Sequence, residues 1–181
     1  MVEYQLIRSS RRTVSVQVTA DGEVVVQAPR LYARYKIEAF LREKEPWIRA
    51  QLEKRAAAPR FSVLSEAEHK ALAKAAKTWF AARAAHFAPT VGVTYGSVTI
   101  RTQKTRWGSC TAKGNLNFNC LLMLAPEEVR DYVVVHELCH RKEMNHSAAF
   151  WSQVERVLPD YKPRRKWLKD NGAALMAAAP Q

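Results

Sequence analysis

Residues 132–140 have the sequence Tyr-Val-Val-Val-His-Glu-Leu-Cys-His, and this segment constrains the fold more than any other part of the chain. Its two histidines, His136 and His140, are four positions apart, so a helix would place both imidazoles on one face, where they can bind one metal ion. The flanking residues are apolar on the other faces, which predicts a buried, central helix. Because two histidines and a glutamate are costly to bury without a partner, the pattern indicates a metal site.

Glu137 follows the first histidine and projects about 100° around the helix axis from it. A carboxylate in that position lies beside a metal-bound water without binding the metal, as zinc hydrolases require. We therefore predict Zn²⁺ as the cofactor, with His136 and His140 as ligands and Glu137 as the general base. Zn²⁺ is preferred on ligand type alone, and imidazole also suits Ni²⁺ and Co²⁺.

A third metal ligand is expected downstream, and the sequence offers two candidates. His146 lies six residues after His140, just past a helix end expected at residues 144–145. Glu155 lies on the following predicted helix and would supply a carboxylate instead. We favour His146, because a third imidazole at this spacing matches a three-histidine zinc site.

Four further residues are candidates for contact with a substrate. Tyr161 and Arg106 could stabilise the oxyanion of a tetrahedral intermediate, although Tyr161 can also be a tyrosine packed in the core. Asn117 and Asn119 alternate with apolar residues on a predicted strand before the metal helix. Their polar face could accompany a substrate backbone that binds as an added strand, or it could belong to an ordinary half-buried strand.

The order of predicted elements indicates an α+β fold rather than a doubly wound parallel sheet. The expected strands, with alternating or continuous apolar residues, are 4–8, 14–18, 24–26, 91–95, 98–101, 105–110 and 116–122. The expected helices are 32–57, 65–87 and most of the chain from Pro126 onward. Ser65 followed by Glu68 is a capping-box pattern that should begin the second helix, and Pro89 should end it. Pro46 is expected to kink or split the first helix, and a hairpin turn is expected at Asp21 and Gly22.

The stretch at residues 56–60 predicts a linker, so we expect an N-terminal β-hairpin and helix lobe over residues 1–58 and a core over residues 59–181. The chain has 29 Lys and Arg against 17 Asp and Glu, and this net charge of +12 suits polyanions or acidic substrates without requiring them. Three cysteines cannot all pair, and no signal peptide or membrane span is evident, so we expect a reduced, cytoplasmic protein without a membrane partner.

Basic residues gather near the C-terminus around Trp167, at Lys162, Arg164, Arg165, Lys166 and Lys169. They could form a nucleic-acid patch, or they could be the solvated face of a helix, which is the interpretation we favour. Trp107 and Trp151 are expected in the core rather than at a platform for substrate.

Four blocks of sequence carry a resemblance to a known family. These blocks are Arg-Trp-Gly-Ser-Cys at 106–110, Asn-Phe-Asn at 117–119, His-Glu-Leu-Cys-His at 136–140 and Asn-His-Ser at 145–147. They resemble the YgjP-like zinc metallopeptidase family, which is related to SprT-type zincins, and the similarity extends over nearly the whole chain. The resemblance implies a minimal zincin core, in which an antiparallel sheet packs on the active-site helix. It also implies His136, His140 and His146 as ligands, Glu137 as general base, and a peptide or protein substrate.

The sequence is therefore consistent with two functions from different classes. The first is a zinc-dependent endopeptidase that hydrolyses peptide bonds through a metal-activated water. The second is a zinc-stabilised basic module that binds nucleic acid or a protein partner without hydrolysis. Glu137 separates the two, because a purely structural zinc site is closed by a fourth protein ligand and needs no free carboxylate.

Overall fold

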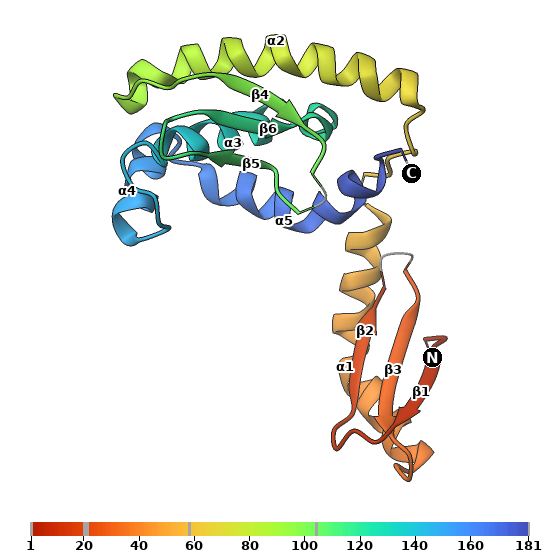
Figure 1. Ribbon diagram of the computed structural model, residues 1–181. Coiled ribbons are helices and arrows are strands. Elements are labelled where there is room, and N and C mark those ends of the chain that lie inside the picture. The colour runs from red at the N-terminus through yellow and green to blue at the C-terminus, as the bar shows by residue number, and fades with distance from the viewer. Residues whose placement is uncertain (1, 20–21, 58, 104, 181) are drawn as a thin grey trace. The chain divides into compact units, whose positions relative to one another are not determined.

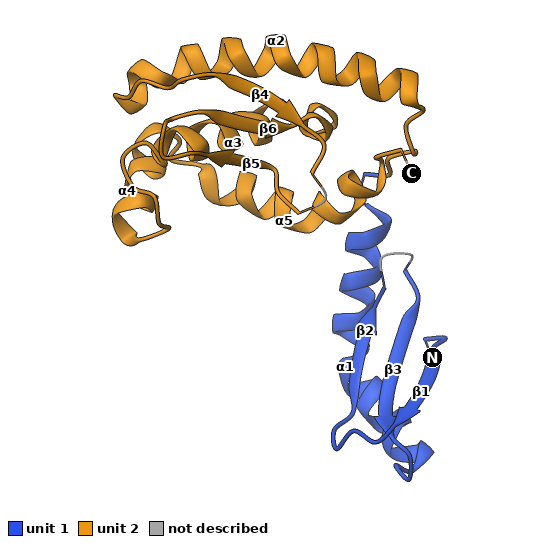
Figure 2. Ribbon diagram, viewed as in Figure 1, with its two compact units in different colours: residues 1–59 blue, residues 60–181 orange. Residues whose placement is uncertain are grey.

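The computed structural model describes residues 2–19, 22–57, 59–103 and 105–180. The chain forms two compact units, residues 1–59 and 60–181 (Figure 2). Both units combine strands and helices, which confirms the α+β class. Asp21, in the predicted hairpin turn, and residue 58, in the predicted linker, lie outside the described residues. No helix in the described ranges is long and apolar enough to cross a membrane.

The small unit is a three-stranded sheet covered by one helix (Figure 1). The central strand β3 (Val24–Pro29) pairs in parallel with β1 (Gln5–Ser9) and antiparallel with β2 (Ser15–Val18). Alternating valines on the strands and the apolar stripe of helix α1 (Arg34–Ala56) meet in one core. The buried members of this core are Val24, Val26, Ala28, Ile37, Leu41 and Ile48.

The larger unit contains a second three-stranded sheet. Its central strand β6 (Leu116–Asn119) pairs antiparallel with β5 (Gly108–Cys110), as the predicted hairpin requires. It pairs in parallel with β4 (Val98–Arg101), so the sheet is mixed and the expected wholly antiparallel sheet is corrected. The chain passes from β4 to the opposite edge of the sheet as β5, and the hairpin then inserts β6 between them. This path makes β4 and β6 run in the same direction.

Helices pack around this sheet and against one another (Figure 1). The elements are α2 (Glu66–Val91), the 3-10 helix η1 (Cys120–Leu124), α3 (Glu127–Cys139), α4 (Ala148–Val157) and α5 (Tyr161–Ala177). The capping pattern at Ser65 and Glu68 begins α2, since each side chain bonds the other residue's backbone N–H. α3, the helix with the two spaced histidines, contacts α2, α4, α5 and β5, and nine of its 13 residues are buried.

Two prolines lie inside helices, where the sequence predicted a kink or split at Pro46 and a helix end at Pro89. Pro46 lies within α1, which is continuous because Leu41 and Ile48 bury its two halves in the same core. Pro89 lies within α2, which continues to Val91 and ends at Gly92, a residue with a left-handed φ of 79°. An internal proline costs about 3 kcal/mol, and packing of the apolar faces outweighs that cost. The extension of α2 also removes the first part of the strand expected at residues 91–95, where no strand forms.

Two other segments differ from the expectation near the metal helix. The strand predicted to reach residue 122 ends at Asn119, whose side-chain oxygen accepts a hydrogen bond from the N–H of Leu121 at 3.0 Å and so caps η1. The helix predicted to end at residues 144–145 ends at Cys139. Turns replace the helix there. In them the backbone N–H groups of Arg141 and Lys142 donate to the carbonyls of Leu138 and Cys139.

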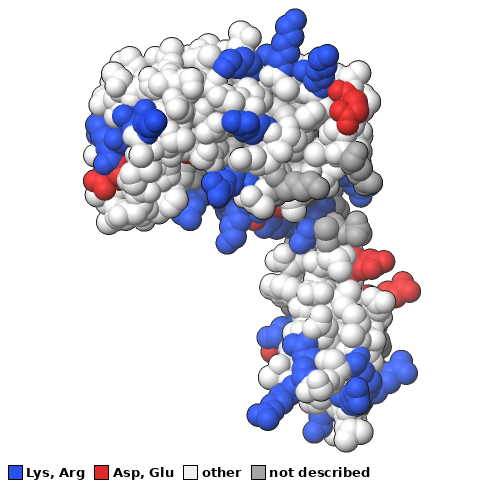
Figure 3. Space-filling model, in the orientation of Figure 1, with Lys and Arg blue, Asp and Glu red and all other residues white. Residues whose placement is uncertain are grey.

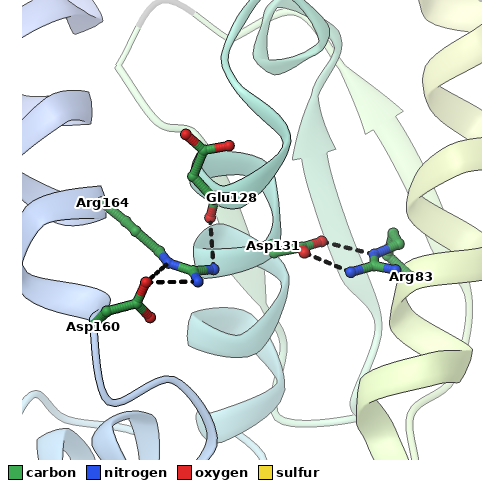
Figure 4. A network of polar contacts seen from close by, with 5 residues as sticks. All are labelled: Arg83, Glu128, Asp131, Asp160 and Arg164. Carbon is green, nitrogen blue, oxygen red and sulfur yellow. Dashed lines mark hydrogen bonds and ion pairs between the residues drawn. The ribbon is translucent and has the colours of Figure 1, made fainter.

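Arginines hold α3 on two sides (Figure 4). Arg83 of α2 donates two hydrogen bonds to the carboxylate of Asp131, at 2.7 and 2.5 Å, and this pairing raises the pKa of Arg83. Arg164 of α5 donates to the backbone carbonyl of Glu128 at 3.2 Å and also pairs with Asp160. Because Asp131 is buried, its pairing with Arg83 ties α3 firmly to α2. These contacts fix the helix that positions the site described below.

Candidate metal centre

Three histidines converge where α3 ends. His136 lies in the last turn of α3, His140 directly follows the helix as its C-cap, and His146 lies in the segment before α4. One ring nitrogen from each histidine can be chosen so that all three lie within 4.8 Å of one another. The Nε2 atoms of His136 and His146 are 3.0 Å apart. Two nitrogens that bind one zinc ion tetrahedrally are about 3.3 Å apart, so the donor set fits a metal ion.

The Asn-His-Ser block determines where His146 lies. The side chain of Asn145 accepts a hydrogen bond from the backbone N–H of Ser147 at 3.2 Å. The hydroxyl of Ser147 accepts one from the N–H of Phe150 at 3.3 Å and begins α4 as its N-cap. His146 is thus held between two capping residues, which explains why an exposed residue can take a defined position beside a buried helix.

Two basic residues anchor the segment between the second and third histidines. Arg141 donates to the carbonyls of Thr94 and Ala112, at 3.0 and 3.2 Å. Lys142 donates to the carbonyl of Val91 at 2.6 Å, at the C-terminal end of α2. Cations are favourable at a helix C-terminus, so Lys142 also complements the dipole of α2. Arg141 and Lys142 thus have a structural role, so these two basic residues need no polyanionic partner to explain them.

Hydrogen bonding prepares His140 as a ligand. Its Nδ1 lies 2.9 Å from the backbone carbonyl oxygen of Glu143, which can only accept. Nδ1 therefore holds the proton, and Nε2 keeps a lone pair for a metal. His136 is positioned by packing instead, against the rings of Phe150 and Tyr132 at 4.9 and 5.8 Å between centroids. Its Nδ1 is buried and has no hydrogen-bond partner within the described ranges.

The surroundings keep the histidines in the form that binds metals. Burial lowers the pKa of His136 to about 3, and the neighbouring imidazoles and Arg165 add to this effect. Burial also lowers the pKa of His146, again with contributions from His140 and Arg165. Neutral imidazole is the metal-binding form, so both rings are ready to bind a cation at neutral pH.

Glu137 follows His136 in α3 and has a buried carboxyl group. It is 4% exposed, and burial raises its pKa to about 8. No side chain or backbone donor among the described residues bonds to its carboxylate. A buried, unpaired carboxyl group with a raised pKa next to possible metal ligands has the properties of a general acid or base.

Gly108 of β5 packs directly on Glu137, a contact that the sequence analysis did not identify. A Cβ atom at position 108 would lie 2.5 Å from Oε1 and 2.8 Å from Cγ of Glu137, closer than real contacts allow. Only glycine therefore lets β5 approach the carboxyl group in this way. Its position inside a strand, where glycine marks close approach of another group, was the available signal.

The other candidate residues lie in different environments. Tyr161 is buried at the start of α5, and its ring stacks on Trp151 at 5.4 Å. Arg106 is exposed, and none of its described contacts reaches the histidines. Glu155, the competing third ligand, accepts a hydrogen bond from Lys162 at 3.2 Å and is not in the cluster of potential ligand atoms. The geometry thus favours His146 over Glu155. Trp107 and Trp151 pack against the core.

Asn117 and Asn119 belong to the central strand β6, whose two edges are already paired. Asn117 donates to the hydroxyl of Ser109 on β5 at 3.1 Å, and Asn119, 2% exposed, donates to the carbonyl of Gln103 at 2.7 Å. A central strand has no free edge, so the expectation that these residues accompany an added substrate strand is corrected. In the described sheet, β4 and β5 are the two edge strands.

The basic residues of α5 do not form one free patch. Three of them have acidic partners, in the pairs Lys162 with Glu155, Arg164 with Asp160 and Lys166 with Asp170. Figure 3 shows Lys and Arg side chains spread over several parts of the visible face. This distribution matches the solvated-helix interpretation and gives nucleic-acid binding no support.

Comparison with known proteins identifies the family. A family model described as YgjP-like, metallopeptidase domain, matches residues 12–70 and 62–171. Among solved structures, the crystal structure of the metallopeptidase zymogen of Pyrococcus abyssi abylysin matches with 26% identity and a TM-score of 0.45 over 50% of this chain and 89% of that chain. The comparison with curated proteins finds no match. Because the matched segments span most of the sequence, the chain belongs to the YgjP-like metallopeptidase family, as its motifs predicted.

Proposed function

We propose that this chain is a zinc-dependent endopeptidase. The observation that carries the proposal is the buried, unpaired carboxyl group of Glu137 on the helix that also supplies two of three convergent imidazoles. A site built only for stability would satisfy such a group with a hydrogen bond or replace it with an apolar residue. A peptidase needs it, because peptide hydrolysis moves a proton from water to the leaving amine.

In this proposal His136, His140 and His146 would hold the ion through neutral ring nitrogens. A bound zinc ion supplies Lewis acidity, which makes water more acidic and polarises a carbonyl group. Burial alone raises the pKa of Glu137 to about 8. A nearby divalent charge would favour the ionised form of this carboxyl group. The carboxylate then takes a proton from the attacking water and gives it to the nitrogen of the broken peptide bond.

The competing function is a zinc-stabilised module without hydrolysis. Structural zinc sites in proteins normally have four protein ligands. Within the described ranges, the group of potential ligands contains only the three histidines. The family assignment as a metallopeptidase domain also favours an enzyme with a peptide or protein substrate.

The test compares Glu137→Gln with the unchanged protein, both loaded with zinc, by elemental analysis and by cleavage of casein. We expect Glu137→Gln to keep one zinc per chain and to lose about 10²–10⁴-fold in the cleavage rate. Glu155→Gln is the matched control, since this glutamate lies outside the cluster and should keep both metal and activity. Unchanged cleavage by Glu137→Gln would remove the proposed mechanism. Loss of zinc in Glu155→Gln, but not in His146→Ala, would overturn the third ligand.

A further inference from the structure

Arg165 is an exposed cation that an aromatic ring holds beside the metal centre. Its guanidinium carbon lies 4.4 Å from the centre of the Trp151 ring. Trp151 in turn stacks on His146, with 5.7 Å between centroids, and lies 5.8 Å from His136. One aromatic ring thus packs against both Arg165 and two imidazoles of the proposed site. In the sequence, Arg165 is one member of the basic group around Trp167.

The pairing of Arg165 differs from that of its neighbours on α5. Lys162, Arg164 and Lys166 each have an acidic partner. Arg165 pairs with no carboxylate in the described part of the chain, and its described contact is the stack on Trp151. A cation–π stack orients a guanidinium group and leaves its N–H donors free for an anion.

The charge of Arg165 reaches the metal centre. It contributes to the lowered pKa values of His136 and His146 and acts in the lowering direction on the pKa of Tyr132. A fixed positive charge this close opposes the binding of a metal cation. An anion that binds beside the metal would balance the charge of Arg165.

We propose that Arg165, oriented by Trp151, forms a subsite for a carboxylate of the substrate close to the bond that is cleaved. This inference rests on the proposed peptidase function. The planar guanidinium fork matches a carboxylate with two parallel hydrogen bonds. The carboxylate can come from an Asp or Glu side chain or from a free C-terminus, and both have the same chemistry. The net charge of +12 favours acidic substrates in the same direction.

The test uses the zinc-loaded full chain and blocked alanine hexapeptides that have one Glu, Gln or Lys at each position in turn. A second set compares a free C-terminal carboxylate with the amide. We expect about five-fold faster cleavage (kcat/KM) of a Glu peptide than of its Gln counterpart, or of the free acid than of the amide. The first result identifies a side chain as the source, and the second identifies the C-terminus.

Arg165→Glu should reverse the preference. The Lys peptide should then be cleaved faster than the Glu peptide or, if the C-terminus is the source, the amide faster than the free acid. Lys74→Glu, on an exposed position of α2, makes the same change in net charge and should keep the original preference. An equal loss on all peptides in Arg165→Glu would show a role in the reaction rather than in recognition, and would overturn the inference. An unchanged preference would also overturn it.

Binding gives a readout that does not depend on hydrolysis. Fluorescence anisotropy of the same labelled peptides is measured with zinc-loaded Glu137→Gln, with and without Arg165→Glu. If no peptide is cleaved but the carboxylate peptide binds about five-fold more tightly and Arg165→Glu reverses this order, the peptidase proposal fails and the subsite stands. If peptides are cleaved and neither binding nor cleavage depends on the carboxylate, the subsite fails and the peptidase stands.

Discussion

The two units of this chain each contain a three-stranded sheet with the same strand order and directions, but they bury different kinds of residue. In each unit the third strand is central, the first strand is parallel to it and the second is antiparallel, giving the orders β1-β3-β2 and β4-β6-β5. The fully buried residues described in the small unit are all apolar. The larger unit also buries the polar residues Asn119, Asp131, Glu137, His140 and Asn171. Since polar burial costs free energy, it marks where packing alone does not explain the structure.

The buried polar residues of the larger unit are of two kinds. Asp131 has Arg83 as its partner, and Asn119 and Asn171 bond to backbone groups, so all three serve the fold. His140 bonds a backbone carbonyl through Nδ1, whereas Glu137 lacks a described partner, as does the Nδ1 of the neighbouring, partly buried His136. The same topology thus supports a lobe with an apolar core in one unit and, in the other, the candidate metal centre.

The largest expected effect is the loss of zinc affinity when a histidine of the larger unit is removed. All five histidines belong to the larger unit. We expect His136→Ala to weaken zinc binding by more than about 10²-fold, because loss of a ligand exceeds the loss of a group that only supports a ligand. A competition titration with a chelating dye measures this. His86→Ala, on α2 outside the cluster, is the matched control, and equal affinity in both variants would contradict the site.

The next effect concerns the buried ion pair of Asp131. We expect Asp131→Ala to lower the free energy of unfolding by about 3 kcal/mol, because it leaves the partly buried Arg83 without its carboxylate. Urea denaturation measures the change. The double variant with Arg83→Leu should lose less than the sum of the two single variants, since the two side chains form one interaction. Additive losses would show that the pair does not hold α3 to α2.

Gly108→Ala should impair activity through Glu137. The new Cβ would overlap the side chain of Glu137 and displace it, and a misplacement of about 1 Å can cost about 10²-fold in kcat. Zinc content should stay unchanged, since no histidine is touched. The control is Gly22→Ala in the small unit, where φ is 86° but no atom lies within 4 Å of the added group. That variant should strain the backbone and leave the cleavage rate unchanged.

The pH dependence of the metal-free protein tests the burial of Glu137. Its folded pKa of about 8 lies above the ordinary value of 4.5, so its contribution to stability is complete below 4.5 and is lost as the pH rises through 8. His136 has a lowered pKa and destabilises the fold only as the pH falls from 6.5 toward 3. Between pH 6.5 and 8, the Tm of chelator-treated protein should therefore fall several degrees more than that of Glu137→Gln. Parallel curves would show a solvated carboxyl group.

Short-range patterns predicted the parts of this molecule that depend on neighbours in sequence. The spacing of His136 and His140 and the capping pattern at Ser65 each specify a local geometry, and the structure contains both. The parallel pairing of β4 and the continuation of α2 through Pro89 depend on tertiary packing, which no local pattern encodes. The contact between Gly108 and Glu137, and the stack of Arg165 on Trp151, likewise join distant segments. Their residue types alone suggested only a strand glycine and a surface charge.

The smallest effect is expected for an ion pair in the small unit. Arg49 donates to Glu45 at 2.7 Å on the exposed face of α1, and this hydrogen bond lowers the pKa of Glu45. The distance resembles that between Arg83 and Asp131, but the carboxylate of Glu45 is solvated, so we expect no measurable change in the urea midpoint of Glu45→Ala. A loss as large as that of Asp131→Ala would mean that proximity of charges, rather than burial, sets the strength of these pairs. The contrast between the two units would then no longer mark a functional site.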